Sequence, residues 1–306
     1  MPGSSPKMMA KAASLSADEI FFDLEDSVPP ASKGEARHAV VAALEDHDYG
    51  NRTVGVRVNA VETKWTADDL TVVIGEAGAR LDCVLVPKVQ RAHEVLFVDH
   101  LLRMLEANAR LERTIGIEAQ IESAIGLENV AEIARASVRL ETLVFGPADM
   151  SASLGLPAVT PGLPMPGYPG DHWHAVRVRI LVAARAAGLQ AIDGPHLAIR
   201  DLDGLREDAT RAAALGYDGK WAVHPAQIDA LNSAFTPPQD DYDRAEALLE
   251  RYRRATEDER RGALMFGSEM IDEASAKMAT AVVRRGRAAG LQVQKTLEDI
   301  EREMSS

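Results

Sequence analysis

Apolar runs along this chain repeatedly end in a polar or charged residue and are then followed by a stretch with helical periodicity. A run that turns ionisable at its C-terminal end is typical of a buried parallel strand that opens onto a pocket. Because this recurs along the chain, we expect the strand ends to line one shared site, as on the C-terminal face of a (β/α)₈ TIM barrel, and the chain is an enzyme candidate. The predicted strands are residues 20–22, 54–56, 83–86, 115–117, 143–145, 190–192 and 221–223.

Helical patterns fill the intervals, at residues 6–16, 33–46, 66–78, 91–110, 125–137, 172–187, 203–215 and 226–234. Residues 155–171 are rich in proline and glycine, so we expect a functional loop there instead of regular structure. After Pro237 and Pro238 the pattern changes to two helices, at 240–261 and 269–288. We therefore predict a catalytic barrel domain over residues 1–236 and a C-terminal helical extension or lid over residues 237–306.

The predicted strands are one short of a complete barrel. The residues from Met1 to Pro6 have the character of a loop that follows a first strand, and that strand is absent. A barrel with an open seam would expose unpaired backbone groups. We therefore expect the true N-terminus to lie upstream of Met1, the alternative being a barrel that is completed in another way.

Composition narrows the class of protein. Of the 306 residues, 46% are hydrophobic and 26% are charged, as in a soluble globular protein with a full core. The net charge of −13 argues against non-specific binding to nucleic acid. Cys83 is the single cysteine, which excludes an internal disulfide, and its place in an apolar strand indicates a buried, inert thiol. With no bilayer-spanning stretch and no signal peptide, we expect a cytoplasmic protein without a membrane partner.

Several motifs stand in a fixed order along the chain. They are residues 2–4 with Lys11, 23–28, 57–59, 86–88, 120–126, 145–149, 192–195, 219–225 and 270–274. With these motifs the chain resembles the HpcH/HpaI aldolase and citrate lyase β-subunit family of CoA-ester lyases, which fold as (β/α)₈ barrels and work as trimers or hexamers. Around residues 170–174 and 219–227 it is most similar to the family's L-malyl-CoA and β-methylmalyl-CoA lyases.

Glu122 and Asp149 are the candidate metal ligands. They follow successive predicted strands, and carboxylate oxygens suit Mg²⁺, with Mn²⁺ as the alternative ion. The residues alone leave open that both carboxylates form salt bridges to Arg57 or Lys88. The resemblance assigns the metal to these same two positions.

Arg57 is the candidate anion clamp, because a guanidinium presents a planar fork that matches a carboxylate or an enolate oxygen. The alternative is a structural partner for the acidic cluster Asp23, Glu25 and Asp26. Strand alternation places Asp23 and Glu25 on one face. We expect one or two of these acids to hold Arg57 or a metal-bound water without contacting the metal.

The resemblance also implies contacts to CoA and substrate. Lys11 matches a CoA-binding lysine of the family, whereas Ser5 stands where some relatives carry an arginine; Lys7, one turn before Lys11, is the candidate to compensate. The alternative interpretation is that both lysines are solvated surface residues that do not bind CoA. The substrate contacts implied by the resemblance are Arg57, Glu122, Ala148, Asp149, Val223 and His224.

Asp272 lies at the start of the predicted helix 269–288, where an acidic residue is ordinarily favoured by the helix dipole, as Glu269 and Glu273 would be. In the family, the aspartate at this position reaches the active site of a neighbouring subunit as the catalytic acid or base. The resemblance therefore makes Asp272 a catalytic candidate in a homotrimer or homohexamer.

The resemblance implies a Mg²⁺-dependent lyase that reversibly cleaves L-malyl-CoA or β-methylmalyl-CoA to glyoxylate and acetyl-CoA or propionyl-CoA. Arg57 would stabilise the negative charge that develops, and Asp272 would protonate the enolate carbon. The alternatives are a citramalyl-CoA lyase that gives pyruvate, a citryl-CoA lyase, a malyl-CoA thioesterase, and a CoA-independent metal-dependent aldolase of 2-keto acids. An inactive partner subunit is disfavoured, because the chain retains Glu122, Asp149, Arg57 and Asp272 together.

Overall fold

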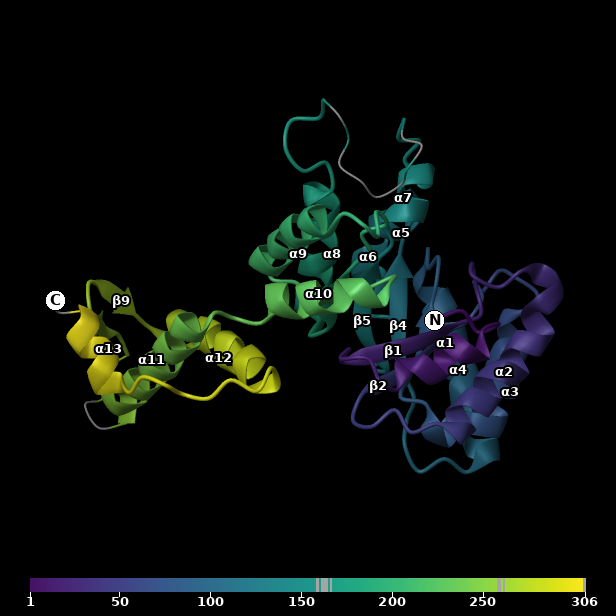
Figure 1. Ribbon diagram of the computed structural model, residues 1–306, viewed down its shortest axis with the longest axis horizontal. Coiled ribbons are helices and arrows are strands. Elements are labelled where there is room, and N and C mark those ends of the chain that lie inside the picture. Colours follow the sequence, from purple (N-terminus) through teal and green to yellow (C-terminus); the bar gives the residue numbers. More distant parts are fainter. Residues whose placement is uncertain (158–159, 161–164, 166, 258–259, 261, 305–306) are drawn as a thin grey trace. The chain divides into compact units, whose positions relative to one another are not determined.

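The computed structural model describes residues 1–157, 160, 165, 167–257, 260 and 262–304, and the chain divides into two compact units (Figure 1). The first unit is Met1–Leu231 and the second is Asn232–Ser306. The division falls within helix α10, Ile228–Phe235, whereas the sequence pattern placed it between residues 236 and 237.

A parallel sheet organises the first unit. Its seven strands pair in sequence order, so each strand lies beside the one that follows it in the chain. Strands β3 and β4 are buried along their whole length, because helices cover the sheet. The strands are β1 Glu19–Asp23, β2 Thr53–Arg57, β3 Cys83–Val86, β4 Gly116–Ile121, β5 Leu140–Phe145, β6 Gln190–Asp193 and β7 Gly219–Lys220.

Helices connect successive strands, and neighbouring helices pack side by side, α2 against α3 and α3 against α4. Because all seven strands pair in parallel, their C-terminal ends lie on one side of the sheet. The helices are α1 Pro6–Ala12, α2 Lys33–Asp46, α3 Thr66–Ala77, α4 Ala92–Ala109, α5 Ala124–Glu128, α6 Val130–Ile133, α7 Pro147–Ser153, α8 His174–Ala187 and α9 Leu202–Leu215, with 3₁₀ turns η1 Pro30–Ser32, η2 Gly78–Arg80 and η3 Pro225–Gln227.

Two element predictions were wrong in this unit. The last strand is Gly219–Lys220, not 221–223, because Val223 donates its N–H to the Gln227 side chain (2.9 Å) and Pro225 begins a 3₁₀ turn. The predicted helix 125–137 is two short helices that meet at Asn129. Of the expected loop 155–171, residues 158–159, 161–164 and 166 lie outside the described residues, and the described ones are in neither helix nor strand.

Both edges of the sheet have further contacts. On the free side of β1, Pro2 forms a parallel bridge with Asp23, Gly3 donates its N–H to the Asp23 carbonyl (2.8 Å), and Asp23 donates its N–H to the Met1 carbonyl (2.7 Å). At the other edge, Trp221 follows β7 and packs on Phe21 of β1, with ring centroids 4.7 Å apart. The sheet is therefore curled, and the residue that follows its last strand packs on a side chain of its first strand.

The second unit is built around helix α11, Gln239–Glu257. The β8–β9 hairpin (Leu264–Phe266, Glu269–Ile271) and helix α13 (Leu297–Met304) form a small apolar core with it, and helix α12 (Glu273–Ala288) packs along it. The predicted helix 269–288 was wrong at its start, because residues 269–271 pair with β8 and the helix begins at Glu273. Residues 258–259 and 261 of the predicted helix 240–261 lie outside the described residues.

None of the helices in the described parts of the chain is both long and apolar enough to cross a membrane.

Candidate metal and substrate site

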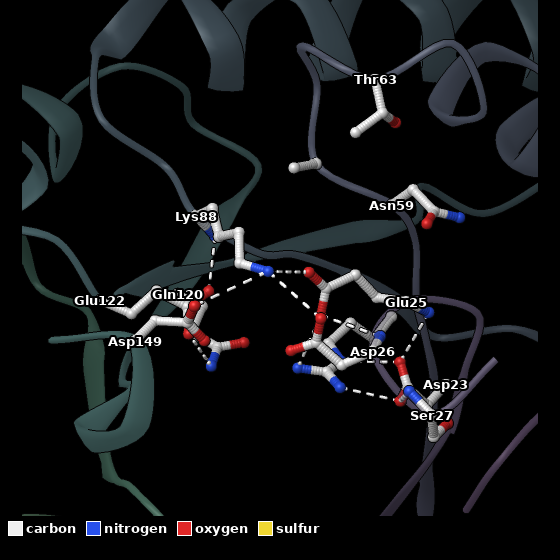
Figure 2. A network of polar contacts seen from close by, with 12 residues as sticks. Asp23, Glu25, Asp26, Ser27, Asn59, Thr63, Lys88, Gln120, Glu122 and Asp149 are labelled. Carbon is white, nitrogen blue, oxygen red and sulfur yellow. Dashed lines mark hydrogen bonds and ion pairs between the residues drawn. The ribbon is translucent and has the colours of Figure 1, made fainter. Parts of the chain in front are cut away.

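Glu122 lies directly after β4, only 2% exposed, and both of its carboxylate oxygens are held by N–H donors (Figure 2). The backbone N–H of Lys88 donates to Oε1 (2.7 Å), and the Gln120 side-chain amide donates to Oε2 (2.7 Å). A Cβ at position 146 would lie 2.4 Å from Oε2, so Gly146 is required for the chain to pass this close. The carboxylate is therefore fixed in one orientation.

Asp149 lies in the first turn of helix α7, which begins at Pro147 after Gly146. Its side chain is 39% exposed, and its Oδ1 is 3.8 Å from the Lys88 ammonium. Burial, and then the negative charge of Asp149, raise the pKa of Glu122 to about 8. Two carboxyl groups whose oxygens face the same lysine, one of them buried with a raised pKa, form a site that a cation would stabilise.

Arg57, the last residue of β2, makes a bidentate ion pair with Asp23: Nε to Oδ1 is 2.7 Å and Nη2 to Oδ2 is 2.8 Å. Its Nη1 lies 3.2 Å from Oε2 of Glu25. Burial opposes ionisation of Asp23, but the hydrogen bonds from Arg57 outweigh it and bring the pKa of Asp23 down to about 2. The expected pairing of Arg57 with the acidic cluster is therefore present, with Asp23 on Nε and Nη2 and Glu25 beside Nη1.

Lys88 connects this pair to the metal candidates. Its ammonium lies 2.5 Å from Glu25 and 3.2 Å from Asp26, in addition to its approach to Asp149 (Figure 2). Hydrogen bonds and ion pairs thus run without a break from Asp23 through Arg57, Glu25 and Lys88 to Asp149 and Glu122. We refer to these residues, together with Asp26, as the acidic network.

The other predicted contacts lie outside the acidic network. Lys7 and Lys11 are exposed on α1, and Ser5 is its half-buried N-cap residue without a side-chain cap bond. His224 is exposed, and its Nδ1 accepts the N–H of Ala226 (3.1 Å). Within the described residues, no hydrogen bond or ion pair links these four side chains to the network. Val223 is 44% exposed, and Ala148 is half-buried beside Asp149.

Asp272 belongs to the second unit, where it is the N-cap of helix α12. Its Oδ1 accepts the N–H groups of Ala274 (2.9 Å) and Ser275 (3.1 Å). The hydrogen bond from the Ser275 backbone is the main cause that lowers the pKa of Asp272. The structure therefore contains the contacts of a helix-capping acid, and these hydrogen bonds keep the Asp272 carboxyl ionised.

One strand end does not share the site. Asp193 ends β6 fully buried, and it pairs with Arg177 (3.0 Å) and with Lys220 (2.6 Å) in a separate cluster. The expectation that every strand end lines one site was therefore too broad. Conversely, sequence reasoning assigned no role to Gln120 or Trp221. Gln120 could have been found, because it lies two residues before Glu122 and so on the same face of β4.

The chain is similar to known proteins over most of its length. The chain is 35% identical over 297 residues to the L-malyl-CoA/β-methylmalyl-CoA lyase of Rhodobacter capsulatus, covering 94% of this chain and 93% of that protein. It is 39% identical over 237 residues to the (3S)-malyl-CoA thioesterase of Cereibacter sphaeroides, covering 78% and 75% of the two chains.

Among solved structures, the protein CitE of Mycobacterium tuberculosis, in complex with magnesium, acetoacetate and coenzyme A, superposes with a TM-score of 0.72. That chain is 32% identical, with 94% of this chain and 96% of that chain covered. The model of the HpcH/HpaI aldolase/citrate lyase family matches residues 1–225, the part of the chain that holds the acidic network. The chain therefore belongs to the HpcH/HpaI aldolase/citrate lyase family.

Proposed function

We propose that this protein is a Mg²⁺-dependent CoA-ester lyase that reversibly cleaves L-malyl-CoA to acetyl-CoA and glyoxylate, or β-methylmalyl-CoA to propionyl-CoA and glyoxylate. The observation that carries the proposal is the Glu122 carboxylate, which two N–H donors hold beside Asp149. The R. capsulatus relative, named for this activity, aligns over nearly the whole chain.

The donor set fits Mg²⁺, with Mn²⁺ as the alternative. All candidate ligand atoms are carboxylate oxygens, which hard divalent cations prefer. Each oxygen of Glu122 accepts one hydrogen bond and retains a second lone pair for a cation, and Asp149 is partly exposed. Glu122 and Asp149 would hold the ion. When bound, it would supply a Lewis acid for the hydroxyl and carboxylate oxygens of the substrate.

The reaction moves one proton and one electron pair. The 3-hydroxyl group loses its proton, the C2–C3 bond breaks, and its electron pair passes to the carbon next to the thioester as an enolate. The former hydroxyl carbon becomes the aldehyde of glyoxylate, and protonation of the enolate carbon gives acetyl-CoA. Arg57 would stabilise the developing negative charge, since Asp23 holds its guanidinium rigidly by two hydrogen bonds.

Asp272 is the proposed acid or base for the enolate carbon, acting in the site of a neighbouring subunit of a homotrimer or homohexamer. The N–H groups that cap its Oδ1 keep it ionised, so it would have to accept a proton before donating one. All the hydrogen bonds described for its carboxylate end on Oδ1, which leaves Oδ2 for this exchange.

The remaining site residues are proposals as well. Lys11 and Lys7 present exposed ammonium groups one turn apart on α1 and would contact the phosphates of CoA, near Ser5. Ala148, Val223 and His224 would contact the substrate acid. Asp23, Glu25 and Asp26 would support Arg57 and Lys88 without contacting the metal.

We further propose that the curled sheet is the greater part of a (β/α)₈ barrel. The parallel pairing of Pro2 with Asp23, and the packing of Trp221 on Phe21, support closure between the two sheet edges. The barrel would be the catalytic domain, and the second unit its C-terminal extension or lid.

A direct assay tests the function. Purified protein is incubated with malyl-CoA, β-methylmalyl-CoA and citramalyl-CoA, with and without Mg²⁺, and the products are separated by chromatography. Glyoxylate together with acetyl-CoA or propionyl-CoA, formed only with Mg²⁺, is the expected result. Pyruvate from citramalyl-CoA as the main product would assign a citramalyl-CoA lyase, and no cleavage of any ester would overturn the proposal. A citryl-CoA substrate and a CoA-free 2-keto acid substrate complete the panel.

The second candidate is a malyl-CoA thioesterase, which the relative from C. sphaeroides favours because it is 39% identical over 237 residues. Its products differ in kind, because hydrolysis releases free CoA and malate and breaks no carbon–carbon bond. Detection of free thiol without glyoxylate would favour it over the lyase.

A further inference from the structure

Lys88 has an unusual backbone conformation. It follows β3 after Pro87, and its φ of +54° lies in the left-handed region, which residues with a side chain seldom adopt. Arg110 has the same conformation for an ordinary reason, since it caps the C-terminus of α4. Lys88 caps no helix, and strain of this kind often marks a functional site.

The strained conformation directs two groups of Lys88 into the acidic network. Its backbone N–H points to Oε1 of Glu122 (2.7 Å), and its ammonium reaches Glu25 (2.5 Å), Asp26 (3.2 Å) and Asp149 (3.8 Å). These carboxylates come from three separate parts of the chain: the loop after β1, the end of β4 and helix α7. One residue therefore contacts both candidate metal ligands, one through its backbone and the other through its side chain (Figure 2).

The charges explain why an ammonium belongs at this point. Glu25, Asp26, Glu122 and Asp149 bring four carboxyl groups close to Lys88. Arg57, the other cation of the network, is engaged by Asp23 and Glu25. The hydrogen bond to Glu25 outweighs partial burial and raises the pKa of Lys88, so it stays positively charged. A cation bound between Glu122 and Asp149 would meet this charge at short range.

We propose that the Lys88 ammonium is the built-in counter-ion of the acidic network, and that by repelling a bound divalent cation it sets the affinity of the site for Mg²⁺. The backbone N–H of the same residue orients Glu122 for that cation. Lys88 is thus a positioning residue, not a metal ligand. This inference rests on the proposed function in so far as it places Mg²⁺ on Glu122 and Asp149.

The test measures Mg²⁺ binding to the full-length, metal-free protein by isothermal titration calorimetry. Lys88→Met removes the charge and keeps most of the stem, so we expect the Kd for Mg²⁺ to fall by about tenfold. The melting temperature of the metal-free protein should fall at the same time, because its carboxylates lose their counter-ion. Lys88→Arg keeps the charge and should leave the Kd within about threefold of wild type.

Two further measurements separate charge from backbone conformation. Lys88→Gly also lacks the ammonium but keeps the N–H and removes the strain, so it should bind Mg²⁺ more tightly than wild type. It also serves as the second variant if Lys88→Met does not fold. The difference between wild type and Lys88→Met should shrink as salt is raised, since the half-exposed ammonium is screened.

The outcomes distinguish this inference from the function on which it rests. Unchanged or weaker Mg²⁺ binding by folded Lys88→Met and Lys88→Gly, while Glu122→Gln abolishes binding, would overturn the role of Lys88 alone. Unchanged Mg²⁺ binding in Glu122→Gln would instead overturn the placement of the metal, and the proposed function with it.

Discussion

Trp221 lies over the guanidinium of Arg57, with the Cζ atom of Arg57 5.7 Å from the indole centroid, although one follows β7 and the other ends β2. The indole also contacts the ring of Phe21 on β1. A cation that faces an aromatic ring at this distance is attracted by its quadrupole. Trp221 therefore both joins the sheet edges and helps to hold the proposed anion clamp.

We expect Trp221→Ala to lower kcat/KM by about tenfold, because it removes the cation–π contact of Arg57 and leaves its guanidinium less firmly held. Trp221→Phe keeps an aromatic face and should retain most of the activity. Steady-state kinetics with the best CoA ester checks this, with circular dichroism to confirm folding. Equal losses in both variants would mean that the indole acts through something other than its ring face.

Glu122→Gln and Asp149→Asn should each reduce activity by several orders of magnitude, because each removes a charged oxygen from the proposed metal site. Excess chelator should have the same effect on the wild-type enzyme, and added Mg²⁺ should reverse it. The measurement is the rate of glyoxylate release. Asp193→Asn is a poor control because its buried cluster supports the fold, whereas exposed Asp203→Asn should leave the rate unchanged. Full activity in excess chelator would contradict the metal assignment.

A pair of carboxyl groups near the other end of the strands, with Glu118 buried and Glu19 half-buried, predicts how stability depends on pH. Ligand atoms of Glu19, Cys83 and Glu118 lie within 4.8 Å of one another. Burial, and then the neighbouring Glu118, raise the pKa of Glu19 to about 9, while burial raises that of Glu118 to about 7. Asp82 and Glu141 add further negative charge.

A carboxyl group whose pKa is higher in the folded state binds more protons there than in the unfolded chain. The pair therefore stabilises the fold at low pH, and this contribution is lost as pH rises from about 4.5 through about 9. Glu118→Gln should remove the part of that loss that comes from Glu118 and from its charge beside Glu19, and leave the part that comes from burial of Glu19. Melting temperatures of both proteins from pH 5 to pH 9 check this, and parallel curves would contradict the contribution of Glu118.

Asp272→Asn and Glu122→Gln should each inactivate the homo-oligomer. If Asp272 serves the site of a neighbouring subunit, mixing the two inactive variants should restore partial activity, because some sites then combine an intact Glu122 with an intact Asp272. The assay follows activity after subunit exchange, which mass spectrometry verifies. No recovery despite exchange would mean that Asp272 serves its own chain or only caps α12.

The strand positions could largely be predicted from the sequence, because burial on both faces leaves a local apolar signature that a polar residue ends. Residues 83–86 were predicted as a strand and form β3. The same signature failed at residues 221–223, where the Gln227 side chain and Pro225 end the ladder early. It also failed at 269–271, because a three-residue hairpin strand is too short for a periodicity to distinguish it from a helix start.

By itself the sequence determined which ionisable residues stand at strand ends, and so it singled out Glu122, Asp149 and Arg57 as candidates. Only the tertiary structure decided which of them meet. It joined Arg57 to Asp23 and Glu25, linked Glu122 to Asp149 through Lys88, and placed Asp193 in a separate buried cluster. Neither the positive φ of Lys88 nor the packing of Trp221 on Phe21 can be predicted from the neighbouring residues in the sequence. Both depend on contacts between residues far apart in the chain, and these form only when the sheet curls.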